Sequence, residues 1–376
     1  MQQLPTSSGQ ARLGAVDSLR GLAAFSVLLG HTLPVCDWRS DFVHWPLAYL
    51  LFDGRSAVTM FFVLSGFVLT FAHLSHSPKP FMVVPFYMRR FTRIWLPWFA
   101  FFLLSMIAKE WLWPSWPDGY LREGRSLAGM WQGETTLPDV LQQMVFQLHN
   151  APRMLLPQDW SLGVELRVSL LIPVFLLLAR WRWWALAAVG LGFAYFAHTT
   201  GYYCTSFAAG VLAACWNART DNFRRGGVLF IIGFVFYQVR WLSDVEGLQS
   251  FFKEREVWVL STVGCTLILL GSLRCERIRN FLEHRIFLFL GRVSYSFYLV
   301  QMIVLICLVP WIVAGLNRIG IQSSAWNQLL LLTVVSGVCL LLAELGVRVI
   351  EFPCIHLGKV LTRWLARHAW VQRLRF

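Results

Sequence analysis

Three ionisable side chains, Asp17, Arg20 and His31, lie in an otherwise apolar stretch between Val16 and Pro34, which reads VDSLRGLAAFSVLLGHTLP. On a helix of about 100° per residue, the three share a stripe roughly 60° wide, and Arg20 and His31 are roughly 16 Å apart along the axis. A charge that faces hydrocarbon is costly, so we expect the stripe to face the protein interior. An imidazole placed there can accept and return a proton near neutral pH, as general acid–base catalysis requires.

Asp17 and Arg20 also admit a purely structural interpretation. In that case Arg20 extends to the inner membrane interface and Asp17 is its ion-pair partner. His31 is harder to explain in this way, because an ionisable group within a membrane helix indicates a functional site.

A second group of charges stands where a later apolar helix begins, in FYMRRFTRIWLP, Phe86 to Pro97. Arg90 and Arg93 are three residues apart and share a helix face, whereas Arg89 points elsewhere. Two guanidinium groups near free backbone N–H groups favour the binding of phosphates. The alternative is that these arginines only set the orientation of the helix in the membrane.

The segment WSLGVELRVSLLIPVF, Trp160 to Phe175, places Glu165 and Arg167 inside a predicted membrane helix. Their spacing of two residues puts them on different faces, so each needs its own partner. Counted from an outer interface at Trp160, Glu165 lies at about the depth of His31, where a carboxylate would orient the imidazole or stabilise its cation. The alternative is a structural ion pair between Glu165 or Arg167 and a neighbouring helix.

Three further polar groups interrupt apolar helices. In FFVLSGFVLTF, Ser65 and Gly66 predict close helix packing, with a catalytic serine as the less favoured interpretation. In FLGRVSYSFYLVQ, Phe289 to Gln301, an otherwise apolar helix carries five polar side chains: Arg292, Ser294, Tyr295, Tyr298 and Gln301. Glu344, Arg348 and Glu351 have the spacing of a self-contained ion ladder, on a helix that we expect to end at Phe352–Pro353.

The composition shows which elements must position these residues. The chain of 376 residues is 57% hydrophobic and 14% charged and has 19 Trp residues, as expected for a polytopic helical membrane protein with aromatic interfaces. No aromatic-interleaved basic domain explains the net charge of +13 by nucleic-acid binding, and the eight Cys have no zinc-ligand spacing. We therefore expect no nucleic-acid partner and no metal.

The expected fold is all-α, a polytopic transmembrane bundle of about ten spanning helices with no separate soluble domain. The predicted spans are about 18–36, 57–74, 94–113, 160–180, 184–198, 202–216, 227–242, 257–273, 287–313 and 327–350. With both termini in the cytoplasm, the inner loops hold most of the 33 Lys and Arg residues. The start lacks the features of a cleavable signal peptide, so we expect the first helix to be retained.

Residues 184–216 are the uncertain part of this topology. Two short helices keep the basic clusters inside, whereas one joined helix would move three of them outside. Residues 114–157 form the long outer segment, in which the pattern after Pro138 predicts an amphipathic helix on the membrane. We expect one domain, 1–376.

Taken together, these segments resemble membrane-bound acyltransferase family 3, the integral-membrane O-acyltransferases of sugars and glycans. DSLRGLAAFSVLLGH matches the opening helix of that family, including the spacing between Arg20 and His31. The further motifs follow in the family's order, to about Pro353: FFVLSGF, YMRRFTRIWLP, WSLGVE, LGRVSYSFYL and the closing Glu-x-Pro at Glu351. Gln301 departs from the family, which often has His there, and many relatives carry a further soluble esterase-like domain.

The resemblance implies that His31 is the catalytic base and that Arg20, Arg90 and Arg93 bind the donor acyl-CoA, most simply acetyl-CoA. Glu165 and Asp17 complete the expected catalytic set. The residues expected to bind the acceptor are Trp160, Ser161, Arg167, Ser294, Tyr295 and Tyr298. The expected acceptor is a hydroxyl of a sugar, a lipid-linked oligosaccharide or a polysaccharide such as an exopolysaccharide or lipopolysaccharide.

We thus expect an O-acyltransferase of the bacterial cytoplasmic (inner) membrane. Two alternatives remain at this point. One is a transporter whose interior charges line a substrate or proton pathway. The other is a non-catalytic scaffold for a glycan-assembly complex.

Overall fold

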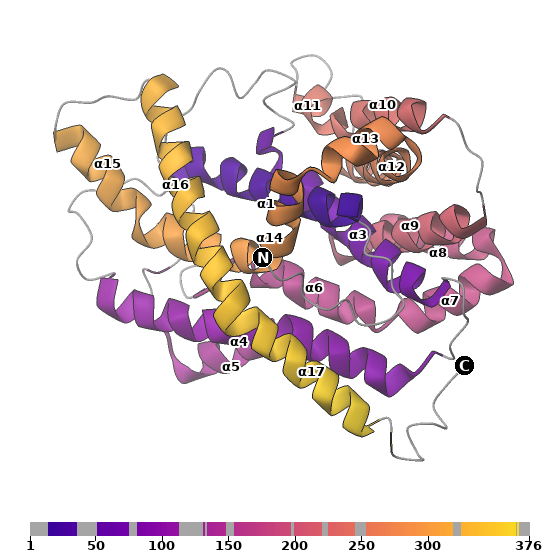
Figure 1. Cartoon of the computed structure of the whole chain (residues 1–376), viewed down its shortest axis with the longest axis horizontal. Helices are drawn as coiled ribbons and strands as arrows, with labels where there is room; N and C mark the ends of the chain where they lie inside the picture. The colour runs from indigo at the N-terminus through magenta and orange to yellow at the C-terminus, as the bar shows by residue number, and fades with distance from the viewer. Residues whose placement is uncertain are drawn as a thin grey trace.

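The computed structural model describes residues 14–35, 51–74, 81–112, 131, 134–147, 154–196, 199–219, 225–244, 253–318, 325–365 and 367. In this part of the chain all regular elements are helices, as the sequence predicts, and they form one bundle (Figure 1). The helices are α1 (Gly14–Val35), α3 (Gly54–Leu74), α4 (Val83–Leu112), α5 (Leu137–Met144), α6 (Asp159–Ser169), α7 (Ile172–Trp181), α8 (Trp183–Phe196), α9 (Thr199–Arg219), α10 (Gly226–Tyr237), α11 (Val239–Asp244), α12 (Glu254–Arg274), α13 (Glu276–Leu282), α14 (Arg285–Cys307), α15 (Val309–Arg318), α16 (Ala325–Gly346), the π-helix η6 (Val347–Glu351) and α17 (Phe352–Leu365).

The expected count of about ten spans is not confirmed. Six helices of the described residues are long and apolar enough to cross a membrane, and a seventh span results if α6 and α7, bent by 49° at their junction, count as one. The α8 helix has 14 residues, about 21 Å, which is short of the roughly 30 Å of hydrocarbon. The α1 and α9 helices are long enough, but their polar and small residues lower the mean hydropathy. The chain is a multi-pass membrane protein with polar interior helices.

The bundle is held together by helix pairs whose backbones nearly touch. A Cβ atom on Gly21 of α1 would lie 2.5 Å from the backbone N of Gly291 on α14. On the neighbouring pair, a Cβ on Gly66 of α3 would collide with the carbonyl of Phe207 on α9. Small residues at such contacts are the usual means by which membrane helices approach closely. These contacts fix α1 against α14 and α3 against α9.

The segment 184–216 forms two helices, as the charge distribution predicted. The Thr205 hydroxyl on α9 donates a 2.7 Å hydrogen bond to the carbonyl of Gly190 on α8. In one straight helix these two residues would be about 22 Å apart. The α8 and α9 helices are therefore an antiparallel hairpin.

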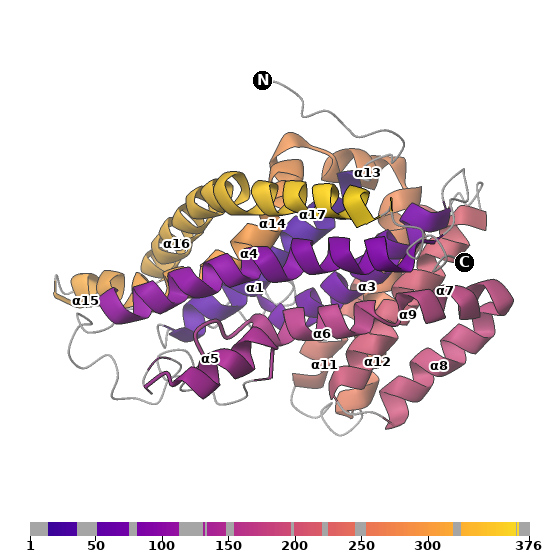
Figure 2. The same cartoon turned by 90° about the horizontal axis from the view of Figure 1, so that it is seen from below.

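The expectation that Phe352–Pro353 ends the last helix is wrong. The chain passes from α16 through η6 into α17, and α17 then runs along α4, where Gly358 lies against Thr92 (Figure 2). In the π turn the N–H of Phe352 donates to Val347, five residues back. Pro353 follows just after the π turn, so the helix continues past a residue that has no N–H to donate.

The predicted ion ladder is confirmed in its first half only. Arg348 Nε lies 2.7 Å from Glu344 Oε1, and Arg292 of α14 joins the same carboxylate at 2.7 Å. Glu351 leaves the ladder and accepts a 3.0 Å hydrogen bond from Ser296. The wide turn of a π-helix changes which residues share a face, so Glu351 turns into the bundle.

Candidate functional site

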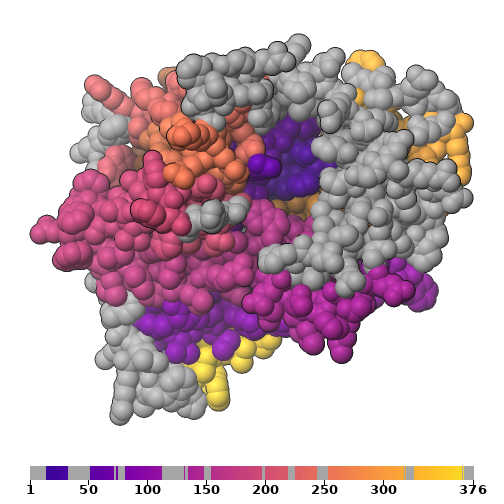
Figure 3. Space-filling view, turned by 180° about the vertical axis from the view of Figure 1, so that it is seen from behind, coloured from indigo at the N-terminus to yellow at the C-terminus, as the bar shows by residue number. Residues whose placement is uncertain are grey.

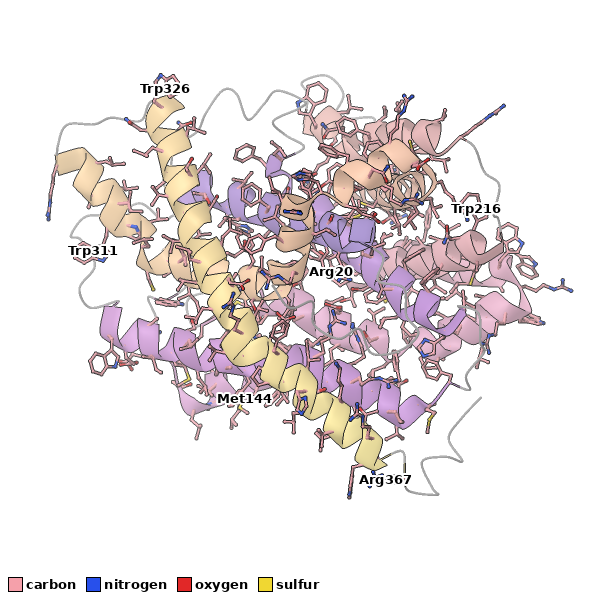
Figure 4. The ribbon with its side chains drawn as sticks, in the orientation of Figure 1. Arg20, Met144, Trp216, Trp311, Trp326 and Arg367 are labelled. Atoms are coloured by element: carbon pink, nitrogen blue, oxygen red, sulfur yellow. The ribbon has the colours of Figure 1, made fainter. Side chains whose placement is uncertain are left out.

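A cavity of about 280 Å³ lies inside the bundle, where α1, α3, α4, α6, α14, the π turn and the start of α17 meet. Arg20 points into this region from α1, near the centre of the molecule in Figure 4. The walls combine apolar side chains with an unusual number of ionisable and hydroxyl groups. The polar residues that line it are Asp17, Arg20, Ser65, Arg90, Arg93, Ser161, Glu165, Arg292, Ser294, Tyr295, Tyr298 and Glu351.

The centre of this polar lining is an ion pair between two helices. Arg90 Nη2 of α4 donates a 2.7 Å hydrogen bond to Glu165 Oε1 of α6, and the Ser65 hydroxyl of α3 donates to the same oxygen at 2.9 Å. The Arg90 guanidinium also donates to the Ser169 hydroxyl at 2.9 Å. The Arg90 and Glu165 side chains are 11% and 21% exposed. The network therefore joins three helices around one largely buried carboxylate.

This network corrects the depth expected for Glu165. The carboxylate lies at the level of Arg90, near the start of α4, and not beside His31. The segment before α6 enters the protein before the helix begins: Leu156 is fully buried, and Gln158 Nε2 donates a 2.8 Å hydrogen bond to Leu299 in the middle of α14. The chain is therefore already inside the bundle before Trp160, and a depth counted from Trp160 does not give the position of Glu165.

Arg20 and Arg93 bring positive charge to the cavity from α1 and α4. Arg20 lies 3.4 Å from Asp17, one turn earlier on α1. Arg93, one turn after Arg90, lines the cavity on the same face and has no hydrogen bond or ion pair to any described residue. Its guanidinium is thus available to an anion that enters the cavity.

The α14 helix forms another wall and is anchored by its tyrosines. The Tyr295 hydroxyl donates a 2.6 Å hydrogen bond to the carbonyl of Ile94 on α4, and the Tyr298 hydroxyl shares a 2.7 Å hydrogen bond with Ser161 on α6. Ser294 of the same helix also lines the cavity. The predicted site residues Ser294, Tyr295 and Tyr298 therefore line one cavity, whereas Gln301 of the same helix is not part of its lining.

Two acidic or hydroxyl residues of the site were not among the predicted site residues. Ser65 was interpreted as a packing residue, and Glu351 as part of the ion ladder. Both line the cavity. Their motifs, Ser-Gly-Phe and Glu-x-Pro, were the available signal, but helical spacing alone could not show that they face the same space.

Three predicted site residues lie outside the cavity lining. Trp160 is 39% exposed and packs on Tyr203, and Arg167 is exposed on the other side of α6. His31 is half-buried further along α1, with its Nδ1 2.7 Å from the carbonyl of Val27. That contact makes Nδ1 the protonated nitrogen and leaves Nε2 with a free lone pair. Among the described residues, Glu165 and His31 share no hydrogen bond.

The cavity suits an anionic, partly apolar ligand. Guanidinium groups pair with phosphates, and its apolar walls accept hydrocarbon. Within the described part of the chain, no group of three or more His, Cys, Asp and Glu side chains could hold a metal ion.

A protein-family model described as an acyltransferase domain matches residues 13–344, nearly the whole chain. No curated protein and no solved structure matches the chain. The matched residues include every element that lines the cavity except the π turn and α17. Since this family model matches far more than half of the sequence, the chain belongs to acyltransferase family 3.

Proposed function

We propose that this acyltransferase moves an acyl group, in the simplest case acetyl, from acyl-CoA to a hydroxyl of a sugar or glycan. It would do so in the cytoplasmic membrane of a bacterium, with both termini in the cytoplasm. The observation that carries the proposal is the interior cavity that arginines from both α1 and α4 line. The family membership supplies the reaction class.

The donor is held by its phosphates. Arg93, which forms no hydrogen bond or ion pair with a described residue, is the first contact, and Arg20 is the second, since its 3.4 Å contact with Asp17 is easily exchanged. Arg90 keeps Glu165 and adds its charge to the same wall. Bidentate guanidinium contacts to phosphate oxygens are short and specific.

The thioester is carried from the arginines towards His31. Arg20 and His31 share one face of α1 and are roughly 16 Å apart along its axis. The pantetheine arm of CoA is a long, narrow chain that can extend over this interval. The separation of the phosphate site from the imidazole is therefore what a CoA donor requires.

The chemical step is direct transfer. His31 Nε2 removes the proton from the acceptor hydroxyl, whose oxygen attacks the thioester carbonyl carbon. The new C–O bond forms as the C–S bond breaks, and the CoA thiolate takes the proton from the imidazolium. The products are the acyl ester and free CoA. Asp17 and Glu165 hold Arg20 and Arg90 in place for the donor, which revises the expectation that Glu165 orients the imidazole.

The acceptor is bound between the cavity and His31. Ser161 and Tyr298 supply hydroxyl groups at the cavity wall, and Ser294 and Tyr295 lie on the same helix. Trp160 offers an aromatic face on which a sugar ring can stack, and Arg167 is exposed beside it. Partners of these kinds suit a polyhydroxyl ligand.

The experiment uses membranes that contain the protein, acetyl-CoA and a thiol reagent that reports free CoA. We expect CoA release that depends on a glycan acceptor and, at acetyl-CoA concentrations below KM, is roughly tenfold slower in Arg93→Gln. The matched control is Arg89→Gln, because Arg89 is exposed and does not line the cavity. Counterflow of a solute without any CoA release would instead establish a transporter, and unaltered glycan acylation in His31→Ala would point to a scaffold.

A further inference from the structure

A second hollow lies on the outer surface of the bundle, away from the cavity described above. Its volume is about 500 Å³, and its walls come from α8, α9 and α12. Figure 3 shows the surface of the α6–α9 region, in pink, adjoining the salmon and orange surface of α10 to α13. We call this hollow the α9–α12 groove. Its lining residues include Trp183, Leu212, Trp216, Val263 and Leu267.

The α9–α12 groove presents hydrocarbon to whatever enters it. The hydroxyl of Thr266, which lines it, donates a 2.8 Å hydrogen bond to Thr262 of its own helix and offers no donor outward. Trp183 is 61% exposed and Val263 is 39% exposed, so the groove opens onto the apolar outer surface of the bundle. In a bilayer this surface faces lipid chains, which are the available molecules that match its chemistry.

One end of the groove is cationic. Arg274, the last residue of α12, holds its guanidinium 5.5 Å from the centre of the Trp216 ring and donates to the carbonyl of Asn217 at 2.7 Å. Arg225 adjoins it, because a Cβ on the following Gly226 would lie 2.6 Å from the backbone of Arg274. Arg182 precedes Trp183 in the chain. Glu276 is the nearby acidic residue, and it is exposed at the start of α13.

The cationic and apolar parts are arranged as the two parts of a lipid are. The helix α8 starts at Trp183, α9 ends shortly after Trp216, and α12 ends at Arg274, so all three termini lie at one end of the groove. Clusters of arginine and tryptophan at helix ends mark the level of lipid headgroups. The apolar part extends from there along α9 and α12 towards the middle of the bundle.

We propose that the α9–α12 groove binds one acyl chain of an anionic glycerophospholipid, with the phosphate at Arg274. The site does not depend on the proposed acyl transfer. It differs from ordinary contact with bulk lipid in two respects: the groove holds one chain in a fixed place, and the arginines select a negative headgroup.

The test uses the full-length protein in nanodiscs and a phosphatidylglycerol whose acyl chain carries a photoactivatable diazirine. After irradiation, peptides are mapped by mass spectrometry. We expect adducts concentrated in residues 209–216 and 263–270, at least fivefold above those formed by phosphatidylcholine with the same chain. Equal labelling by the two lipids, or labelling no higher than on the exposed face of α10 at Ile231 and Val235, would overturn the proposal.

Two pairs of variants make the test specific. Ala209→Trp fills the groove and should reduce its adducts at least fivefold, whereas Ala188→Trp, on the exposed face of α8, should leave them unchanged. If Ala209→Trp does not elute as a folded protein, Val263→Trp replaces it, since Val263 is already exposed. In Arg274→Gln the two lipids should label the groove equally. In Arg277→Gln, a change at an exposed residue of α13, phosphatidylglycerol should still label it more strongly. Groove labelling that persists in Ala209→Trp would contradict the site.

Discussion

Arg90 of α4 and Glu165 of α6 form a 2.7 Å ion pair at the wall of the central cavity. The Ser65 hydroxyl donates to the same carboxylate oxygen, so α3 is held to the pair as well. The pair is neutral as a whole, and it leaves neither of the two largely buried charges without a counter-charge. The neighbouring Arg93 lines the cavity and forms no hydrogen bond or ion pair with a described residue, so its guanidinium can contact a ligand.

Removing one member of this ion pair should destabilise the protein more than replacing both members by apolar residues. In Glu165→Gln the largely buried Arg90 loses its counter-charge, and we expect a loss of about 3 kcal/mol in unfolding free energy. Thermal unfolding in detergent measures this. The double variant Arg90→Met/Glu165→Leu should recover most of the stability while transfer remains lost. Equal stability of Glu165→Gln and the native protein would show that the pair is structurally neutral.

Arg93→Gln should weaken the binding of the acyl-CoA donor, with little effect on folding. A charged hydrogen bond to phosphate contributes about 1.5–3 kcal/mol, so KM for acyl-CoA should rise by roughly tenfold or more. Kinetics at saturating acceptor provide the measurement, with Arg89→Gln as the control. An unchanged KM in Arg93→Gln would assign Arg93 to membrane orientation only.

The close contact of α1 and α14 predicts opposite effects for two glycine substitutions. Gly21→Ala places a Cβ against the backbone of α14 and should destabilise the protein by about 1–3 kcal/mol. Gly337→Ala meets no atom within 4 Å and should stabilise α16 by about 0.5–1 kcal/mol. Melting temperatures of the two variants give the comparison. A Gly21→Ala protein as stable as Gly337→Ala would contradict the tight α1–α14 contact.

The proposed orientation of the protein, with both termini in the cytoplasm, predicts the side of the membrane on which each of three loop positions lies. In a protein without native cysteines, Tyr120→Cys should react with an impermeant thiol reagent from outside. Asn222→Cys and Asn280→Cys should react only from the cytoplasmic side. Positions 120 and 222 fall outside the described residues, so their placement is a prediction from charge alone. Any other labelling pattern would overturn the assignment of both termini to the cytoplasm.

Apolar run length and charge were enough to predict the helical fold. They predicted that 184–216 is a hairpin, which the bond between Thr205 and Gly190 confirms. The sequence predicts that this helix starts at about 94, whereas α4 begins at Val83. The prediction is too late because a run of apolar residues leaves out Arg89, Arg90 and Arg93. Hydrogen bonding continues a helix through charges that a hydropathy window treats as its end.

The site was less accessible to sequence reasoning than the fold. Helical spacing correctly placed Arg90 and Arg93 on one face and Glu165 and Arg167 on different faces. The partner of Glu165 depends on how deeply the chain enters before α6, and that depth is set by contacts with α14 that no local pattern records. The direction of the Glu351 side chain depends on a π turn, which the regular helical spacing of 3.6 residues per turn does not predict.

The most direct test of the mechanism is the turnover of His31→Ala in membranes supplied with radiolabelled acetyl-CoA and a glycan acceptor. General base catalysis contributes about 10²–10⁴-fold, so we predict that kcat falls at least 100-fold while the KM for acetyl-CoA, set at the distant arginines, is unchanged. The variant should fold and insert normally, because the half-buried His31 bonds only to Val27 among the described residues. A His31→Ala protein that transfers acetyl groups at near the native rate would contradict the account.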